Sequence, residues 1–98
     1  MSKLHQLLGL AMRAGKVVSG EERVLSAIRS GVAFLVLISD DAAPNARKKI
    51  SDKSKHYGVP LITAGSRVEL GRALGKAERV VVAVTDPGFA KAIRKRCE

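Results

Sequence analysis

The hydrophobic residues recur at intervals that predict short helices alternating with short strands. Before Gly15, four apolar residues repeat at helical spacing and predict a first helix: Leu4, Leu7, Leu8 and Ala11. Val17 and Val18 can form only a short strand. A second helix is predicted to end at Gly31, with three apolar residues on its inner side: Val24, Ala27 and Ile28. The first third of the chain therefore predicts a helix, a strand and a second helix.

The middle of the chain continues this alternation. Residues 33–38 form a continuous apolar run that is too short for a helix and rich in branched side chains, which predicts a strand covered on both faces. Pro44 is placed to begin a third helix that ends at Gly58. The inner side of that helix is predicted to carry Ala46, Ile50 and Tyr57. Residues 59–63 predict another short strand.

Two more helices flank a last buried strand over residues 79–84. The fourth helix is predicted to end at Gly75 and to use three apolar residues: Val68, Leu70 and Leu74. Asp86 and Pro87 are a good start for the terminal helix, whose inner side would hold Phe89, Ala90, Ile93 and Cys97. This order predicts an α/β fold, a three-layer α/β/α sandwich with a small mixed central sheet, as a single domain over residues 1–98.

Two serines stand three residues before a glutamate at predicted helix starts. Ser19 precedes Glu22, and Ser66 precedes Glu69. In a capping box, the serine side chain accepts a backbone N–H of the helix while the glutamate accepts the N–H of the serine. Both serines are therefore predicted to be helix caps, which gives them a structural role.

Composition indicates a polyanionic partner. The chain has 98 residues, a formal net charge of +9 and an isoelectric point near 10.3. Because the basic residues are spread over several elements and form no amphipathic membrane helix, nucleic acid is favoured over a membrane surface or a simple solubility device. No apolar segment approaches the roughly 20 residues that span a bilayer, and we read no signal peptide, so a cytoplasmic protein is expected.

Candidate chemistry for an enzyme is weak. Cys97 is the single cysteine, and His5 and His56 have no ligand at metal-binding spacing, so neither a metal site nor a cofactor is expected. Gly15 and Gly20 have the separation of phosphate-loop glycines, but acidic residues follow them where Lys and Ser or Thr belong. Asp40 and Asp41 after a buried strand can be catalytic acids, although a polar loop is the favoured interpretation. We predict that the protein is not an enzyme.

Two loops are candidate contacts for RNA. The first, Lys16 to Arg23, places a helix start and the small Gly20 between basic residues, where backbone N–H groups can meet phosphate. Glu21 and Glu22 can accept hydrogen bonds from a guanine edge, or can simply stabilise the helix start. The second loop, Gly75 to Arg79, is by itself typical of an ordinary turn.

Basic residues on the outer side of the third helix are either solvated or a secondary contact for RNA: Arg47, Lys48, Lys49, Lys53 and Lys55.

Six strings along nearly the whole chain resemble the bacterial YlxQ-type members of the kink-turn RNA-binding ribosomal protein superfamily. They are Gly-Leu-Ala-Met-Arg-Ala-Gly-Lys at residues 9–16, Val-Ser-Gly-Glu-Glu at 18–22, Phe-Leu-Val-Leu-Ile-Ser-Asp-Asp-Ala at 34–42, Val-Pro-Leu at 59–61, Leu-Gly-Arg-Ala-Leu-Gly-Lys at 70–76 and Val-Val-Val-Ala-Val-Thr-Asp-Pro-Gly-Phe-Ala at 80–90. Each string is a modest signal, but together they are specific.

The resemblance implies non-catalytic binding of a kink-turn, an RNA helix sharply bent at a bulge that is flanked by sheared G·A pairs. In such proteins the start of the second helix meets the G·A pairs, and the loop before the last strand covers the bulged nucleotides. The corresponding residues here are Gly20, Glu21, Glu22, Arg23 and Ser26 at the helix start, and Lys76, Ala77, Glu78 and Arg79 in the loop. Lys16 and Ser19 of the first loop complete the predicted RNA-binding residues. Ribosomal RNA or a messenger leader is the expected target, with ribosome or ribonucleoprotein association and a monomeric protein.

Two features depart from the pattern of that superfamily. Its best-known members carry an Asn-Glu pair at the second-helix start and a Lys three residues later, where this chain has Glu22, Arg23 and Ser26. Their bulge-covering loop is more apolar than Lys76-Ala77-Glu78. The alternative hypothesis is therefore a protein-interaction module with weak or lost RNA binding. A small hydrolase built on Asp40 and Asp41 is a more distant third.

Overall fold

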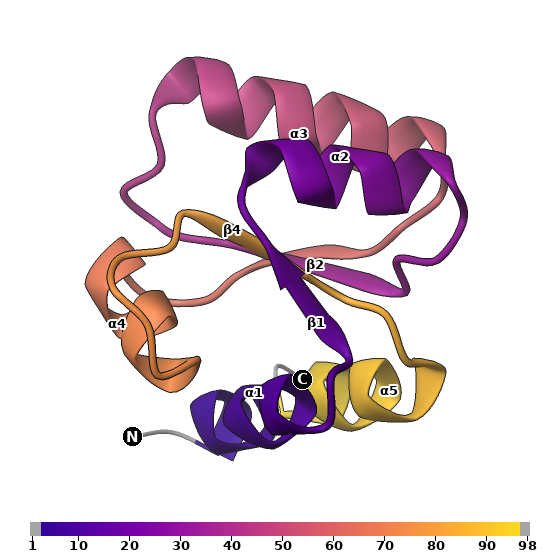
Figure 1. Ribbon diagram of the computed structural model, residues 1–98. Helices are drawn as coiled ribbons and strands as arrows, with labels where there is room; N and C mark the ends of the chain where they lie inside the picture. The colour runs from indigo at the N-terminus through magenta and orange to yellow at the C-terminus, as the bar shows by residue number, and fades with distance from the viewer. Residues whose placement is uncertain (1–2, 97–98) are drawn as a thin grey trace.

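The computed structural model describes residues 3–96, which form helices and strands in alternation (Figure 1). The helices are α1 (Lys3–Arg13), α2 (Glu21–Arg29), α3 (Pro44–His56), α4 (Arg67–Ala73) and α5 (Pro87–Lys95). The strands are β1 (Val17–Ser19), β2 (Leu35–Ile38), β3 (Leu61–Thr63) and β4 (Val81–Val84). The predicted order of elements is confirmed, although the last three strands each begin two residues later than expected.

The four strands form one mixed sheet in the order β1-β4-β2-β3. Strand β4 runs antiparallel to both of its neighbours, with Ser19 opposite Val82 and Ile38 opposite Val81. Strands β2 and β3 are parallel. Helices α2 and α3 cover one face of the sheet, and α1, α4 and α5 lie on the other side (Figure 1). The predicted three-layer α/β/α sandwich with a small mixed sheet is confirmed.

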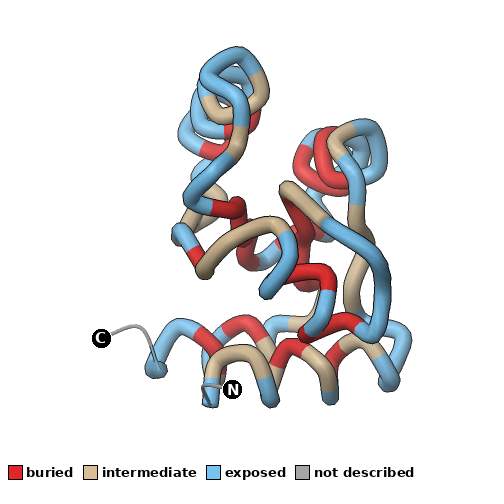
Figure 2. The backbone as a smooth tube through the Cα atoms, turned by 90° about the vertical axis from the view of Figure 1, so that its left-hand side faces the viewer, coloured by how far each residue is buried: buried red, intermediate tan, exposed pale blue. Residues whose placement is uncertain are grey.

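Side-chain alternation along the central strands divides the core into two halves. Leu35 and Leu37 of β2 pack among α1, α4 and α5, whereas Val36 and Ile38 pack against α2 and α3. All four of these side chains are fully buried, as expected for a strand with helices on both faces. Figure 2 shows the buried segments gathered between the layers, with the outer sides of the helices exposed. This double burial explains the continuous apolar run in the sequence.

Three residues predicted to face the core do not. Tyr57 is the C-cap of α3 and is 45% exposed, and Val68 on α4 is 47% exposed. Phe34 precedes β2 and is 42% exposed, so the run that is covered on both faces begins at Leu35. On α3 the small Ser54 is buried beside Ile50 instead. Cys97, predicted on the inner side of the last helix, lies outside the described residues.

The prediction that Ser19 and Glu22 form a capping box is wrong. The N-cap of α2 is Gly20, with φ of 96°, and Ser19 is the last residue of β1. Because β1 must pair with β4 up to Ser19, the chain can turn into the helix only at the next residue, where glycine tolerates the positive φ. The Ser19 hydroxyl does not cap the helix and instead accepts a hydrogen bond from Arg79 Nε at 3.3 Å.

The predicted capping box of Ser66 and Glu69 is confirmed. It makes the free energy of unfolding depend on pH. Hydrogen bonds from Ser66, first of all from its backbone N–H at 2.9 Å, hold the pKa of Glu69 below its ordinary value because they favour the carboxylate. The resulting stabilisation is complete above the pKa of an unfolded glutamate, about 4.3. It is lost as the pH falls through the lower pKa of the folded state.

Removing the Glu69 charge is therefore expected to matter near neutral pH and not in acid. We expect Glu69→Gln to unfold at a lower urea concentration than the parent protein at neutral pH, with a difference that shrinks in acid once Glu69 is protonated in both states. Urea unfolding of both proteins over a pH series measures this. A difference that is the same at every pH would contradict the prediction.

Candidate nucleic-acid interface

Pairing between β1 and β4 brings two distant segments of the chain together. Ser19 lies opposite Val82, and the Gly20 N–H donates to the Val81 carbonyl at 3.0 Å. The start of α2 therefore lies beside the segment that enters β4. These segments are about 60 residues apart in sequence, and the pairing of β1 with β4 brings them together.

Hydrogen bonds of Arg79 hold the turn before β4 against neighbouring segments. Its Nε donates to the Ser19 hydroxyl at 3.3 Å, and its Nη1 donates to the Glu78 carbonyl at 2.8 Å. Its backbone N–H donates to the Arg67 carbonyl at 3.0 Å. These partners are neutral oxygens, so the contacts orient the guanidinium without cancelling its positive charge.

Helix α4 supports the same turn from the other side. The Lys76 N–H donates to the Gly71 carbonyl at 2.9 Å, and Gly75 has the positive φ of 72° that is common just after a helix. The buried Gly71 packs directly against the turn, because a Cβ at this position would lie 1.9 Å from the Ala77 carbonyl oxygen. Only glycine allows this approach between helix and turn.

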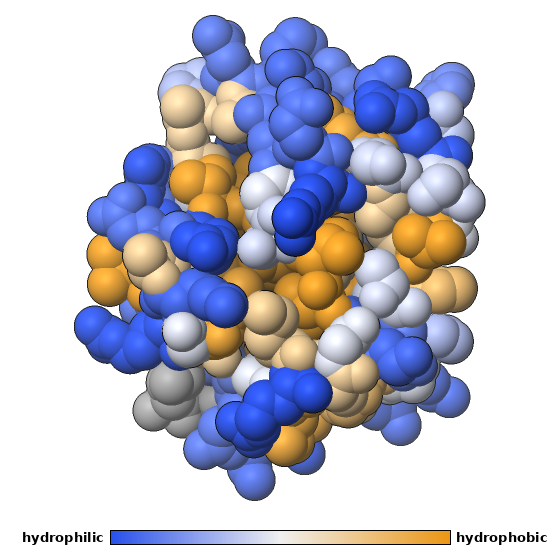
Figure 3. Space-filling model, viewed as in Figure 1, coloured by the Kyte–Doolittle hydropathy of each residue, from blue (hydrophilic) through white to orange (hydrophobic). Residues whose placement is uncertain are grey.

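A cleft of about 670 Å³ opens where these segments meet. Its floor is apolar and includes Ile38, Ile50 and Val81, which come from β2, α3 and β4. Its rim is charged and consists of Glu21, Arg23, Arg67, Glu78 and Arg79. Ser19, Gly20, Ala43, Ala46 and Val80 complete the lining. The space-filling view in Figure 3 shows apolar side chains exposed between hydrophilic ones over the central sheet.

The helix start at the cleft is rich in hydrogen-bond donors. Since Gly20 has no side chain, no side-chain oxygen caps the first turn of α2. The first backbone N–H groups of a helix have no partner within the helix and carry a partial positive charge. An acceptor or anion entering the cleft beside Gly20 can therefore meet backbone donors directly.

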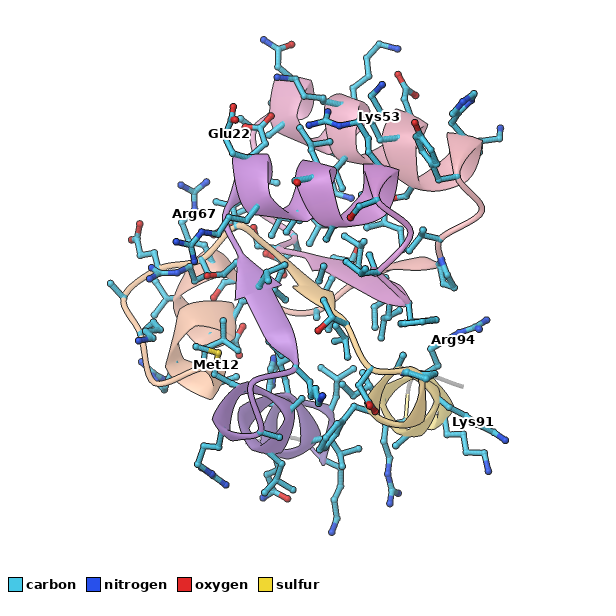
Figure 4. The ribbon with its side chains drawn as sticks, turned by 45° about the vertical axis from the view of Figure 1, so that its right-hand side comes forward. Met12, Glu22, Lys53, Arg67, Lys91 and Arg94 are labelled. Atoms are coloured by element: carbon cyan, nitrogen blue, oxygen red, sulfur yellow. The ribbon has the colours of Figure 1, made fainter. Side chains whose placement is uncertain are left out.

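Ion pairs neutralise two of the carboxylates near the cleft. Glu21 contacts Lys49 of α3 with an Oε1 to Nζ distance of 3.1 Å. Asp41 contacts Arg67, with 3.4 Å between Oδ1 and Nε, and the Arg67 backbone N–H also donates to Asp41 Oδ1 at 3.1 Å. Figure 4 shows Glu22 and Arg67 on the same side of the molecule, at the α2 start and beside α4. Arg23 and Arg79 add positive charge to this rim.

The structure brings together part of the predicted residue set. Ser19, Gly20, Glu21 and Arg23 line the cleft with Glu78 and Arg79. The others lie outside its lining: Lys16, Glu22, Ser26, Lys76 and Ala77. Lys16 is at the opposite end of β1, where its carbonyl accepts the Thr85 N–H at 2.8 Å. Lys76 and Ala77 are exposed on the same turn that carries Glu78 and Arg79.

Sequence reasoning missed the contributions of α3 and α4 to the cleft. Arg67 lines it from the start of α4, and Ala43 and Ala46 line it from the start of α3. The small size of the two alanines at a predicted helix start was the only available signal. Lys49, grouped with the solvated lysines, is held by Glu21 near the cleft.

Residues 3–96 contain neither a cluster of potential metal ligands nor a membrane-spanning helix. Across this range, no three His, Cys, Asp or Glu side chains are grouped so that they could hold a metal ion. None of the helices in the same range has the length and apolar character needed to cross a membrane.

The three-layer sandwich and the cleft between the start of α2 and the turn before β4 define the structural class. It is a small basic α/β/α domain with a recessed site, rich in hydrogen-bond donors, at one end of the sheet. The chain belongs to the ribosomal protein L7Ae/L30e/S12e/Gadd45 family, whose sequence profile matches residues 2–94.

Relatives and a solved structure agree with this membership. The chain is 57% identical over 84 residues to RNA-binding protein YlxQ of Bacillus subtilis, covering 86% of this chain and 84% of that protein. It is 33% identical to large ribosomal subunit protein eL30 of Pyrobaculum neutrophilum, covering 96% and 95% of the two chains. A solved protein of unknown function from Bacillus halodurans has a TM-score of 0.96 at 43% identity, with 98% and 97% coverage. The resemblance to YlxQ-type proteins is confirmed.

A more distant structure shares the fold. The Giardia lamblia 15.5kD RNA binding protein superimposes with a TM-score of 0.84 at 23% identity, covering 95% of this chain and 80% of that chain. The sandwich is therefore retained where most of the sequence has changed.

Proposed function

We propose that the chain binds structured RNA of the kink-turn type through the cleft between α2 and the turn before β4, as a single non-catalytic domain. Ribosomal RNA or a messenger leader is the proposed target. We further expect the protein to act as a monomer in the cytoplasm and to associate with the ribosome or another ribonucleoprotein.

One observation carries the proposal: the uncapped start of α2 and the Glu78–Arg79 turn share one cleft. A bent RNA presents phosphates and exposed purine edges close together, so its recognition needs donors and acceptors from more than one segment. Backbone N–H groups beside Gly20 supply donors, and Arg23 and Arg79 supply charge for phosphate. The exposed carboxylate of Glu22 can accept from the amino and imino groups of guanine.

Family membership supports RNA as the ligand. The names of the Bacillus subtilis and Giardia lamblia proteins both describe RNA binding, and eL30 is a ribosomal protein. The net charge of +9 favours the same class of partner.

The decisive experiment compares two RNAs that differ only at the bend. We expect a kink-turn duplex to bind at least about tenfold tighter than the same duplex with its G·A pairs changed to Watson–Crick pairs, since one charged hydrogen bond contributes about 1.5–3 kcal/mol. Titration by fluorescence anisotropy at moderate salt measures both affinities. Equal affinities would contradict specific recognition. Recovery of a protein partner after nuclease treatment, with no RNA enrichment, would favour the protein-interaction module.

A further inference from the structure

The end of the sheet opposite the cleft exposes two aromatic rings. Phe34 is 42% exposed just before β2, and Tyr57 is 45% exposed at the end of α3. The cleft lies at the starts of α2 and α3, whereas Tyr57 lies where α3 ends. Figure 4 shows Lys91 and Arg94 projecting from α5 on the side of the molecule away from Glu22 and Arg67.

Phe34 and Arg94 separate two shallow hollows at this end. One hollow, of about 470 Å³, is lined by Phe34 and Arg94 with Pro87, Ala90, Lys91 and Lys95. The other, of about 380 Å³, shares Phe34 and Arg94 and is also lined by Tyr57. We call the residues Phe34, Tyr57, Lys91, Arg94 and Lys95 the aromatic patch. Both rings and Arg94 thus face a common hollow, and the lysines continue from it along α5.

Ordered backbone presents both rings. The Phe34 N–H donates to the Val84 carbonyl at 2.9 Å, which ties its backbone to β4. The Tyr57 N–H donates to the Lys53 carbonyl at 3.1 Å, and the Tyr57 ring packs edge-on against His56 with 5.0 Å between centroids. Because the backbone at both positions is already ordered, little backbone entropy is lost when a flat ligand stacks on the rings.

The described residues that line the two hollows carry charge of one sign. Among the described residues that line the two hollows there are three cations, Lys91, Arg94 and Lys95, and no carboxylate. Asp86, at the start of α5, directs its carboxylate to the Phe89 N–H at 2.8 Å. The cleft differs, because its rim contains both acidic and basic side chains. A partner suited to the aromatic patch therefore combines flat apolar faces with negative charge.

We propose that the aromatic patch binds an unpaired stretch of RNA, with bases stacking on Phe34 and Tyr57 and phosphates held by Lys91, Arg94 and Lys95. Exposed aromatic rings next to cations are the features that bind single strands without sequence preference. This second contact is independent of the cleft. It allows one protein to hold a folded RNA element at one end and a flanking single strand at the other.

The aromatic residues themselves provide the measurement. The sequence has one tyrosine, two phenylalanines and no tryptophan, so ring signals in an NMR spectrum are few. We expect a short oligouridine to shift the ring protons of Tyr57 and Phe34 saturably and to leave those of Phe89 unchanged. Tyr57→Ala is expected to weaken oligouridine binding by about tenfold, the effect of losing one base stack.

Charge variants separate the aromatic patch from general attraction to a basic protein. Arg94→Glu should weaken oligouridine binding and flatten its salt dependence, whereas Arg13→Glu, the same change at an exposed position on α1, should have a much smaller effect. Equal effects of the two variants would overturn the proposal. Equal ring shifts with an oligoglutamate of matched charge would also overturn it, in favour of an acidic protein partner.

The two proposed RNA contacts, at the cleft and at the aromatic patch, can be tested separately. Arg79→Ala is expected to weaken kink-turn binding, because Arg79 belongs to the cleft, and to affect oligouridine binding no more than Arg13→Glu does. If oligouridine shifts neither ring while the kink-turn duplex still binds with specificity, the aromatic patch proposal is overturned and the function proposed for the cleft stands.

Discussion

Replacement of Gly71 by alanine is expected to lower the free energy of unfolding by about 3 kcal/mol, the upper range for overpacking a buried site. A Cβ at this position lies 1.9 Å from the Ala77 carbonyl oxygen and 2.7 Å from its carbon. Both are backbone atoms, so no side-chain rotation can relieve the clash. Helix α4 or the turn over residues 75–79 must move, and kink-turn affinity should fall with the displacement of Arg79. Urea unfolding and RNA titration measure the two effects.

Gly75 is the matched control for this substitution. It belongs to the same helix end, but a Cβ there meets no atom within 4 Å. Its φ of 72° makes alanine unfavourable by only about 1–2 kcal/mol, through backbone strain. We therefore expect Gly75→Ala to be the milder variant and to retain more RNA binding. A Gly71→Ala protein with unchanged stability and affinity would show that helix and turn are not in this close contact.

Replacement of Arg79 by alanine is expected to lower kink-turn affinity about 10- to 100-fold, since a hydrogen bond to a charged group contributes about 1.5–3 kcal/mol. Arg79 provides charge at the cleft, and its bonds to Ser19 and Glu78 hold the turn against the end of β1. Lysine should not restore full affinity, because it lacks the planar fork that reaches both partners. Anisotropy titration of the kink-turn duplex measures the change.

Substitutions of Arg23 and Arg29 provide the comparison with Arg79→Ala. Arg23 lines the same cleft but is exposed, so Arg23→Ala should weaken binding less and reduce the salt dependence by about one phosphate contact. Arg29, exposed at the other end of α2, should have little effect. If Arg29→Ala weakens kink-turn binding as much as Arg79→Ala, the cleft is not the site of specific recognition.

Much of the fold could be predicted because its signals are local. The apolar run over residues 33–38 predicted a strand covered on both faces, and the four residues that form β2, Leu35–Ile38, are all buried. Pro44 and Asp86 marked the starts of α3 and α5 correctly, since both act within the first turn of a helix. Ser66 and Glu69 lie three residues apart, so their capping box needs only the backbone of α4. Such features depend little on distant parts of the chain.

Local reasoning failed where a distant strand competes for the same residue. Ser19 has the correct spacing to cap α2, but pairing with Val82 keeps it in β1 and leaves its hydroxyl to Arg79. Tyr57 continues the apolar stripe of α3 by spacing, yet the helix ends one residue earlier and the ring remains exposed. Periodicity cannot show where packing stops.

The sequence by itself determined the order of the elements, the three layers, the basic character and the family resemblance, because these follow from side-chain spacing, composition and short motifs. The resemblance implied that the two loops meet one RNA, and the tertiary structure shows Gly20 and Arg79 lining one cleft. Only the tertiary structure decided that Arg67 and Lys49 lie beside it, and that Phe34, Tyr57 and Arg94 gather at the opposite end. The physical reason is that β1 and β4 join segments about 60 residues apart. Their proximity depends on sheet pairing and on the packing of the helices against the sheet, which no local pattern encodes.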